Sequence, residues 1–226
     1  MPENPRENRE RPVRVALLGQ PNVGKSSLFS RLTGVGVISS NYPGTTVSFD
    51  EGAITRNGRT VTVRDLPGTY SISGNSDDER VVLKNLMEEE FDCVVLVADA
   101  ASLSGSLVLC IEAMELGIPT ILALNKIDAA RRDFDIDAEK LGSLLGTKVV
   151  FVSSKTSEGV DALADAICAG EAVLSPLKIS YDAGIEAGIA CVSDALPEHL
   201  PFSRRGIALK ILEGTTEFDS YADANL

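Results

Sequence analysis

A phosphate-binding motif stands near the start of the chain. It reads Gly19, Gln20, Pro21, Asn22, Val23, Gly24, Lys25 and Ser26, which matches the pattern Gly-x-x-x-x-Gly-Lys-Ser/Thr. In such a loop backbone N–H groups surround phosphates, the lysine reaches the outer phosphates and the serine hydroxyl is a ligand for Mg²⁺. We expect these roles for Lys25 and Ser26, and an inner-phosphate contact for Ser27. A glycine-rich turn with a surface lysine is the alternative, but the position of the motif, between an apolar run and a helical pattern, favours the phosphate loop.

A second short motif, Asp65-Leu66-Pro67-Gly68, follows the strand predicted at 60–64. The pattern Asp-x-x-Gly is common in proteins, so the argument depends on its position. At the carboxyl end of a strand beside the phosphate loop, Asp65 can hold Mg²⁺ through water and the Gly68 N–H can bind the γ-phosphate. An aspartate that caps a turn is the alternative.

Two further segments predict which base is bound. Asn125-Lys126-Ile127-Asp128 follows another apolar run, at the edge where open α/β sheets bind ligands. The Asp128 carboxylate can accept hydrogen bonds from guanine N1–H and its amino group, whereas adenine would leave it unpaired. The aliphatic stem of Lys126 can cover the base, and a backbone N–H of Ser153-Ser154-Lys155 can bind the guanine carbonyl. The expected ligands are therefore GTP and GDP, with Asn125 in the same binding set. An Asn/Asp turn with a helix cap is the alternative.

The segment Asn41-Tyr42-Pro43-Gly44-Thr45-Thr46-Val47 lies between the phosphate loop and the next predicted strand. One hydroxyl here is expected to complete the Mg²⁺ shell when a γ-phosphate is present, so that the loop is ordered by GTP and relaxes after hydrolysis. We expect Thr46 to be this ligand and count Thr45 among the nucleotide-binding residues. The alternative is a Pro-Gly turn before an ordinary strand.

Strands and helices alternate around these motifs. Apolar runs predict six strands, and Asn57-Gly58 predicts a hairpin turn between the second and the third. The predicted strands span 13–18, 48–55, 60–64, 91–98, 119–124 and 148–152, and helices are predicted to open at Gly24 and to lie near 79–89, 105–116, 137–145 and 158–168. This order indicates an α/β fold, a P-loop Ras-like G domain with a six-stranded, mostly parallel sheet and one antiparallel edge hairpin.

The chain divides into a tail, a G domain and a helical part. Residues 1–12 have no apolar run and read as a solvated tail. The G domain is predicted to occupy 13–169. Residues 170–226 show no strand-like run, but Ile185, Ile189, Val192 and Leu196 share one helical face, as expected of a small all-helical domain.

Composition excludes several classes of protein. The 226 residues include 33 acidic and 21 basic ones, a net charge of −12, which opposes nucleic-acid binding. Four scattered cysteines and one histidine favour neither a disulfide framework nor a zinc site, and indicate a reduced, cytosolic setting. No apolar run approaches the 18 or so residues needed to span a membrane, so the chain itself is expected to be soluble. We assign no ferrous iron site, and an oligomer remains compatible with the sequence.

The order of these motifs resembles that of the translation-factor-related small GTPases. The segments 41–47 and Asp65-Leu66-Pro67-Gly68-Thr69-Tyr70-Ser71 are similar to signatures of the ferrous iron transport protein B family, and 179–181, 185–186 and 208–214 are similar to the helical domain that follows its G domain. The resemblance implies a GTP-hydrolysing regulatory domain that signals its nucleotide state to a membrane permease, in the same or a separate chain, at the cytoplasmic face of the inner membrane. It also implies a helical domain that favours the GDP-bound form.

Catalysis is expected to be slow and to depend on potassium. Thr69 stands where Ras-like GTPases place the glutamine that orients the attacking water. Asn22, with a switch loop that resembles the family's Asn-aromatic-Pro-Gly stretch, suggests a K⁺ ion held by the Asn22 side chain and the carbonyls of Ser40 and Tyr42, where it would stabilise transition-state charge. The family often has Gly-Asn-Trp where this chain has Ser-Asn-Tyr, and the alternative is that Asn22 only suits the loop backbone. The predicted catalytic residues are Lys25, Asn22, Thr46 and Gly68.

Two other functions are weighed. A ribosome-assembly GTPase shares the phosphate-loop wording but is expected to carry a basic RNA-binding appendage, whereas residues 170–226 contain four basic and nine acidic residues. The other is a nucleotide-sensing module that binds GDP or GTP without useful turnover, which hydrolysis measurements would separate from an enzyme.

Overall fold

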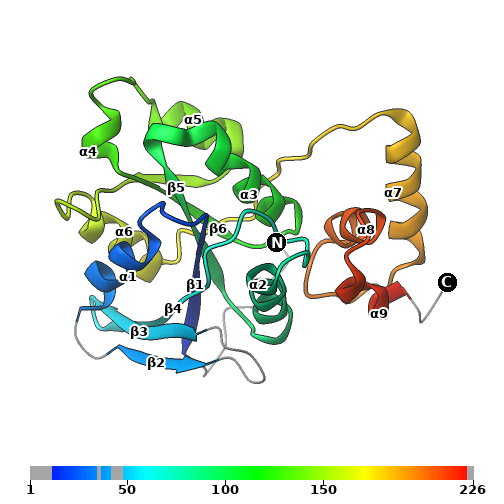
Figure 1. Cartoon of the computed structure of the whole chain (residues 1–226), viewed down its shortest axis with the longest axis horizontal. Helices are drawn as coiled ribbons and strands as arrows, with labels where there is room; N and C mark the ends of the chain where they lie inside the picture. Colours follow the sequence, from blue (N-terminus) through cyan, green and yellow to red (C-terminus); the bar gives the residue numbers. More distant parts are fainter. Residues whose placement is uncertain (1–11, 35–36, 42–47, 223–226) are drawn as a thin grey trace, which may run out of the picture.

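The computed structural model describes residues 12–34, 37–41 and 48–222. A seven-stranded sheet lies at the centre and helices cover both of its faces (Figure 1). The strands are β1 (Val13–Gly19), β2 (Ile38–Asn41), β3 (Ser48–Arg56), β4 (Arg59–Asp65), β5 (Cys93–Asp99), β6 (Thr120–Asn125) and β7 (Lys148–Phe151). The α-helices are α1 (Lys25–Thr33), α2 (Asp77–Glu88), α3 (Leu103–Glu115), α4 (Ile127–Ala130), α5 (Ala138–Leu145), α6 (Val160–Ala169), α7 (Ala183–Ala195), α8 (Arg204–Leu212) and α9 (Asp219–Ala222), with short 3₁₀ turns η1 (Ala100–Ser102) and η2 (Thr216–Phe218).

The sheet has the strand order β2-β3-β4-β1-β5-β6-β7. From β4 to β7 all neighbouring strands are parallel, whereas β2, β3 and β4 pair antiparallel. The turn between β3 and β4 has positive φ at both central residues, 50° at Asn57 and 77° at Gly58, as a tight hairpin turn requires. The predicted mostly parallel sheet with an antiparallel hairpin at its edge is confirmed.

The predicted number of six strands is wrong, because β2 adds a seventh. This strand pairs Ile38–Asn41 with the edge of β3. Its side chains are largely exposed, with Ile38 66% exposed, so no buried face imposes a hydrophobic period on its sequence. Backbone pairing with β3 forms this strand, and such pairing leaves no hydrophobic pattern in the sequence.

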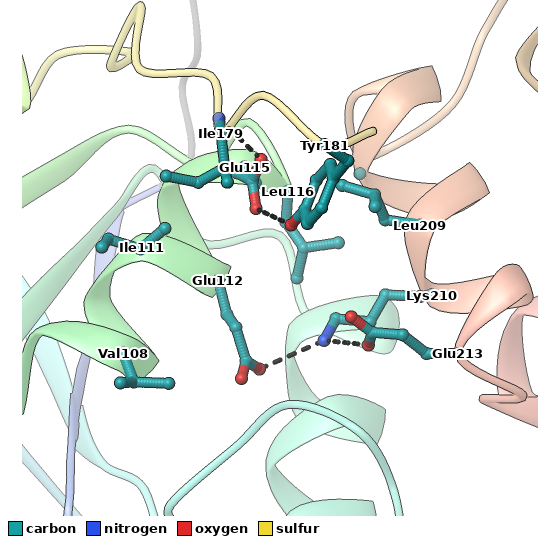
Figure 2. A pocket seen from close by; sticks show the side chains of 11 residues that line it. Val108, Ile111, Glu112, Glu115, Leu116, Ile179, Tyr181, Leu209, Lys210 and Glu213 are labelled. Atoms are coloured by element: carbon teal, nitrogen blue, oxygen red, sulfur yellow. Dashed lines mark hydrogen bonds and ion pairs between the residues drawn. The ribbon is translucent and has the colours of Figure 1, made fainter. Parts of the chain in front are cut away.

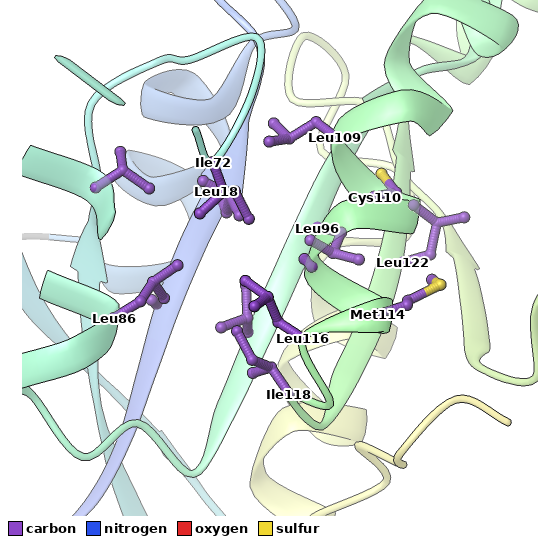
Figure 3. Close-up of a cluster of buried hydrophobic side chains, with 14 of the residues drawn as sticks. Leu18, Ile72, Leu86, Leu96, Leu109, Cys110, Met114, Leu116, Ile118 and Leu122 are labelled. Carbon is purple, nitrogen blue, oxygen red and sulfur yellow. The ribbon is translucent and has the colours of Figure 1, made fainter. Parts of the chain in front are cut away.

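Alternate residues along the strands face two separate cores. One face packs against α1 and α6, through buried residues such as Leu28, Phe29 and Leu163. The other packs against α2 and α3, where Leu86, Leu109 and strand residues such as Leu96 meet (Figure 3). This two-sided burial explains the near-continuous apolar runs of the parallel strands.

Helices α7, α8 and α9 lie together beside α2 and α3 (Figure 1). Asp182 and Ser203 cap the starts of α7 and α8 by accepting backbone hydrogen bonds, which is how short polar side chains begin helices. Of the predicted face of α7, Ile189 is buried but Ile185 is 44% exposed. No helix in the described ranges combines the length and apolar character needed to cross a membrane.

Candidate nucleotide-binding site

Polar segments from distant parts of the chain meet at the carboxyl edge of the parallel strands. Gly19 ends β1, Asp65 ends β4 and Asn125 ends β6, and Ser153 follows two residues after the end of β7. Because these strands are parallel, their carboxyl ends lie at one edge of the sheet. The structure therefore brings together the phosphate loop, the Asp65–Gly68 segment and both base-reading segments.

The phosphate loop turns sharply before α1. Asn22 and Gly24 have φ values of 66° and 87°, in the left-handed region. A Cβ on Gly24 would lie 2.5 Å from Asn125 Nδ2, so glycine is needed both for its backbone conformation and for the space. Helix α1 begins at Lys25, and the N–H groups of its first three residues have no acceptor within the helix. They can therefore bind an anion held in the loop.

Lys25 and Asp65 form a buried ion pair beside the loop. Lys25 Nζ donates to the Asp65 carboxylate and to the Leu66 carbonyl, and both charged side chains are 7% exposed. Ser26 and Gly68 help line the adjacent cavity of about 180 Å³. Hydroxyl and carboxylate oxygens are ligands that Mg²⁺ prefers, so Ser26 and Asp65 fit this ion.

The Asp65–Gly68 segment is docked on the phosphate loop. A Cβ on Gly68 would lie 3.1 Å from Pro21 Cα, and the Thr69 N–H donates to the Gly19 carbonyl at 3.2 Å. The Thr69 hydroxyl donates to the Ser71 carbonyl at 2.9 Å. Thr69 therefore directs its polar group along its own segment.

The Asn125 side chain braces the phosphate loop from behind. Its Nδ2 group donates to the Val23 carbonyl at 2.8 Å and to Ser154 Oγ at 3.2 Å, and its Oδ1 accepts from the Ser154 N–H at 2.9 Å. Asn125 is fully buried. A buried amide without hydrogen-bond partners would destabilise the folded protein. This network therefore fixes the phosphate loop against the Ser153–Lys155 segment.

Asp128 is held by Ser153, whose hydroxyl donates to Asp128 Oδ1 at 2.7 Å. This hydrogen bond lowers the pKa of Asp128 below its ordinary value, with smaller help from the backbone and from the charges of Lys155 and Arg132, while desolvation opposes the change. The carboxylate is thus ionised at neutral pH and oriented by a buried neighbour. It is an acceptor that can read two donors on one base edge.

Asp99 is a site residue that the sequence analysis did not include. Its carboxylate contacts Lys126 Nζ at 2.6 Å, while its other oxygen accepts from the Ala101 N–H at 2.9 Å. Lys126 has a φ of 62°, and the ion pair adds a second restraint on its direction. The signal in the sequence is the one that identified Asp65, a carboxylate at the carboxyl end of an apolar run, and Asp99 lies in register with Asn125 on the next strand.

The structure gives contacts for some of the other predicted residues, whereas further ones lie outside the described part of the chain. The Gln20 side chain donates to the Gly105 carbonyl at 2.9 Å. Ser40 lies in β2 opposite Phe49, and Asn22 is exposed. Its left-handed backbone by itself can account for asparagine. The predicted switch and potassium residues Tyr42, Thr45 and Thr46 lie outside the described residues.

Comparisons with known proteins agree on one family. The family model of ferrous iron transport protein B matches residues 13–167. The chain is 33% identical over 219 residues to an Fe(2+) transport protein A/Fe(2+) transporter FeoB fusion protein of Porphyromonas gingivalis, covering 92% of this chain and 26% of that protein. It thus spans about a quarter of the length of the curated relatives it matches.

Solved structures match over almost the whole chain. The cytosolic domain of the T. maritima FeoB iron transporter in a GDP form is 39% identical, with a TM-score of 0.88 over 95% of this chain and 86% of that one. The same domain in its GMPPNP form is 39% identical, with a TM-score of 0.87 over 94% and 85%.

Proposed function

The chain belongs to the ferrous iron transport protein B family, and we propose that it is the GTP-binding and slowly GTP-hydrolysing regulatory part of a ferrous iron transporter. In this proposal its nucleotide state controls the membrane permease part, in the same or a separate chain, from the cytoplasmic face of the inner membrane. The ribosome-assembly alternative is set aside, because the matching family is a different one. The observation that carries the proposal is the meeting of the phosphate loop, Asp65 and Asp128 at one sheet edge.

Phosphate binding follows from the loop and the start of α1. The loop N–H groups and the helix N-terminus bind the phosphates, with Ser27 near the inner one. Lys25 would exchange its contact with Asp65 for the outer phosphates. Ser26, Asp65 and Thr46 are the residues that would hold Mg²⁺. Mg²⁺, when bound, neutralises charge between the β- and γ-phosphates. The GDP and GMPPNP forms of the T. maritima relative support a guanine nucleotide as the ligand.

Guanine recognition rests on the group fixed by Ser153. Asp128 accepts from the N1–H and the amino group of the base, Lys126 covers the base plane while Asp99 holds its ammonium, and a backbone N–H of 153–155 binds the base carbonyl. Adenine presents no N1–H to Asp128, so ATP leaves a carboxylate unpaired.

Hydrolysis is slow in this proposal because Thr69, the residue after Gly68, does not orient the attacking water. Thr69 is 3% exposed, and its hydroxyl is committed to Ser71. K⁺ held by Asn22 and by the carbonyls of Ser40 and Tyr42 would supply the positive charge that an arginine supplies elsewhere.

Base preference tests the binding proposal. Asp128→Asn is expected to weaken GTP binding about 100-fold and to favour xanthosine triphosphate, because the amide can donate to the second base carbonyl. Binding is measured by competition with a fluorescent GDP analogue. Unchanged preference for guanine would show that Asp128 does not read the base.

Turnover tests the enzymatic part. Single-turnover hydrolysis by the wild type is expected to be faster in KCl than in NaCl at equal ionic strength, and Asn22→Ala should remove this difference. Equal wild-type rates in the two salts would exclude the potassium site. Binding without any hydrolysis would favour the nucleotide-sensing module.

A further inference from the structure

Glu112 on α3 joins two distant parts of the molecule. Its carboxylate accepts a hydrogen bond from the Ile72 N–H at 2.7 Å and another from the Ser71 hydroxyl at 3.0 Å. The same carboxylate contacts Lys210 Nζ of α8 at 3.1 Å (Figure 2). Ser71 and Ile72 lie three and four residues after Gly68, so a single side chain connects the continuation of the Asp65–Gly68 segment to the C-terminal helices.

The buried ammonium group of Lys210 is stabilised by its contact with Glu112. Its side chain is only 4% exposed, and Glu112 is 21% exposed. The other partner of Lys210 is Glu213, at 2.8 Å on the same helix, which is 49% exposed. A buried ammonium group needs close acceptors to offset its desolvation, and Glu112 is the less exposed of its two carboxylate partners.

Helix α8 is fixed on α3 one turn away from this pair. A Cβ on Gly206 would lie 2.5 Å from the Glu115 carbonyl oxygen. Ser203 donates its N–H to the Leu116 carbonyl at 2.7 Å and its hydroxyl to the Glu115 carbonyl at 2.6 Å. This close approach sets where Lys210 meets Glu112.

The segment after Asp65 is held at both ends. At its start the Leu66 N–H donates to the Leu17 carbonyl at 3.2 Å, and the Thr69 N–H donates to the Gly19 carbonyl at 3.2 Å. At its end Ile72, which is fully buried, donates to Glu112. Only two residues separate Thr69 from Ile72, so the position of one end constrains the other.

We propose that Glu112 is a positioning residue for the Gly68 N–H, and that Lys210 of α8 sets how firmly Glu112 holds this segment. The inference rests on the proposed function, because it takes the γ-phosphate as the partner of Gly68. Since GDP has no γ-phosphate, the effect is confined to the triphosphate state. Helix α8 thus acts on triphosphate binding and hydrolysis without touching the nucleotide.

The test compares Glu112→Gln, Lys210→Met and the double variant. Each single change should lower GMPPNP affinity and the single-turnover rate of GTP hydrolysis about fivefold, and should leave GDP affinity unchanged within about twofold. If Lys210 acts through Glu112, the double variant should lose no more than the stronger single variant. Urea unfolding checks that each variant is folded.

Glu115→Gln is the matched control. Glu115 lies on the same helix, but its carboxylate accepts from the Ile179 N–H at 3.2 Å and from the Tyr181 hydroxyl at 3.4 Å, away from Lys210 (Figure 2). It should leave GMPPNP affinity at the wild-type level. Ser71→Ala removes one hydrogen-bond donor to the Glu112 carboxylate. This variant replaces Glu112→Gln in the test if Glu112→Gln does not fold.

The outcomes separate the inference from the function on which it rests. A wild type that binds no guanine nucleotide contradicts the proposed function. A wild type that binds, with folded Glu112 and Lys210 variants of unchanged GMPPNP affinity and hydrolysis, overturns the inference. Equal losses of GDP and GMPPNP affinity overturn it too, because they indicate general damage to the site.

Discussion

The phosphate loop and the Asp65–Gly68 segment face the same cavity but are held in different ways. The phosphate loop is fixed by the left-handed backbone of Gly24 and by the buried amide of Asn125. The Asp65–Gly68 segment packs against the phosphate loop. Farther along the chain, the Ile72 N–H donates to the Glu112 carboxylate, which also contacts Lys210. The phosphate loop is held by residues of the G domain, whereas the segment that follows Asp65 is also connected, through Glu112, to Lys210 of the C-terminal helices.

The hydrophobic cores on the two faces of the sheet also differ in whether they include residues of the C-terminal helices. The cluster on the α1 and α6 face draws its buried described residues from Val15 to Cys168. The cluster on the α2 and α3 face also takes buried residues from the C-terminal helices, namely Ile189, Leu196, Phe202, Ile207, Ala208, Leu209 and Phe218. The phosphate loop leads into α1, whereas Leu66 and Ile72 at and after the Asp65–Gly68 segment are buried in the same cluster as the C-terminal helices.

Removing residues 170–226 should have the largest effect on this comparison. We predict that the remaining G domain folds, because its α1 and α6 core is complete. Its free energy of unfolding should fall by about 3 kcal/mol or more, since α3 residues such as Leu109 and Leu116 lose apolar neighbours. GDP dissociation should also become faster, as the family resemblance implies. Urea unfolding and release of a fluorescent GDP analogue measure the two effects.

Single substitutions in the full chain serve as the control for that truncation. Leu163→Ala on the α1 and α6 face and Phe218→Ala on the other face should each cost about 3 kcal/mol, because both side chains are fully buried. Only Phe218→Ala should also weaken GMPPNP binding. A truncated protein as stable as the full chain would show that the two parts do not share a core.

Gly24→Ala should have the next largest effect, on the phosphate loop. The added Cβ would meet Asn125 Nδ2 at 2.5 Å at a φ of +87°, so the loop must shift and lose the hydrogen bond to Val23. We expect GDP and GMPPNP affinity to fall together by about 100-fold. Gly34→Ala is the control, because Gly34 also has a positive φ of +67°, but an added Cβ there would meet no described atom within 4 Å beyond its chain neighbours and its own helix. Full nucleotide affinity in Gly24→Ala would contradict the bracing role of Asn125.

Asp99→Asn should have a smaller effect on base binding. The ion pair with Lys126 would weaken, so its stem would cover the base less often, and we expect about fivefold lower affinity for both GDP and inosine diphosphate. The loss is equal because stacking does not read the amino group of guanine. In a Lys126→Met background, which keeps most of the stem without the charge, Asp99→Asn should have no further effect. A further loss there would mean that Asp99 acts by another route.

Local patterns predict most of the fold because burial is periodic wherever strands and helices cover one another. The Asn57-Gly58 hairpin and the phosphate loop were predictable because particular residues are needed at positive φ. Strand β2 and the single turn of α4 were not, because an exposed edge and a four-residue helix bury too little to form a pattern.

The contact that joins the two parts could not be predicted from the sequence. Glu112 and Lys210 are 98 residues apart, and each alone reads as an ordinary charged position on a helix. Only the close approach of Gly206 to α3 brings them together. Asp99, in contrast, was within reach of sequence reasoning, because it ends an apolar strand as Asp65 does.

Ser153→Ala should give the smallest effect, on the pH dependence of guanine binding. The Ser153 hydroxyl is the main cause of the lowered pKa of Asp128, whose ordinary value is 3.8. Removing it should let this pKa rise, so the fraction of ionised Asp128 falls at a higher pH in the variant than in the wild type. The ratio of wild-type to variant GDP affinity should therefore be nearly constant from about pH 7.5 to pH 5.5 and grow below about pH 5. Taking the ratio cancels titration of the nucleotide phosphates, and Ser153→Thr, which keeps the hydroxyl, should follow the wild type. A ratio that stays flat at low pH would show that Ser153 positions Asp128 without controlling its charge.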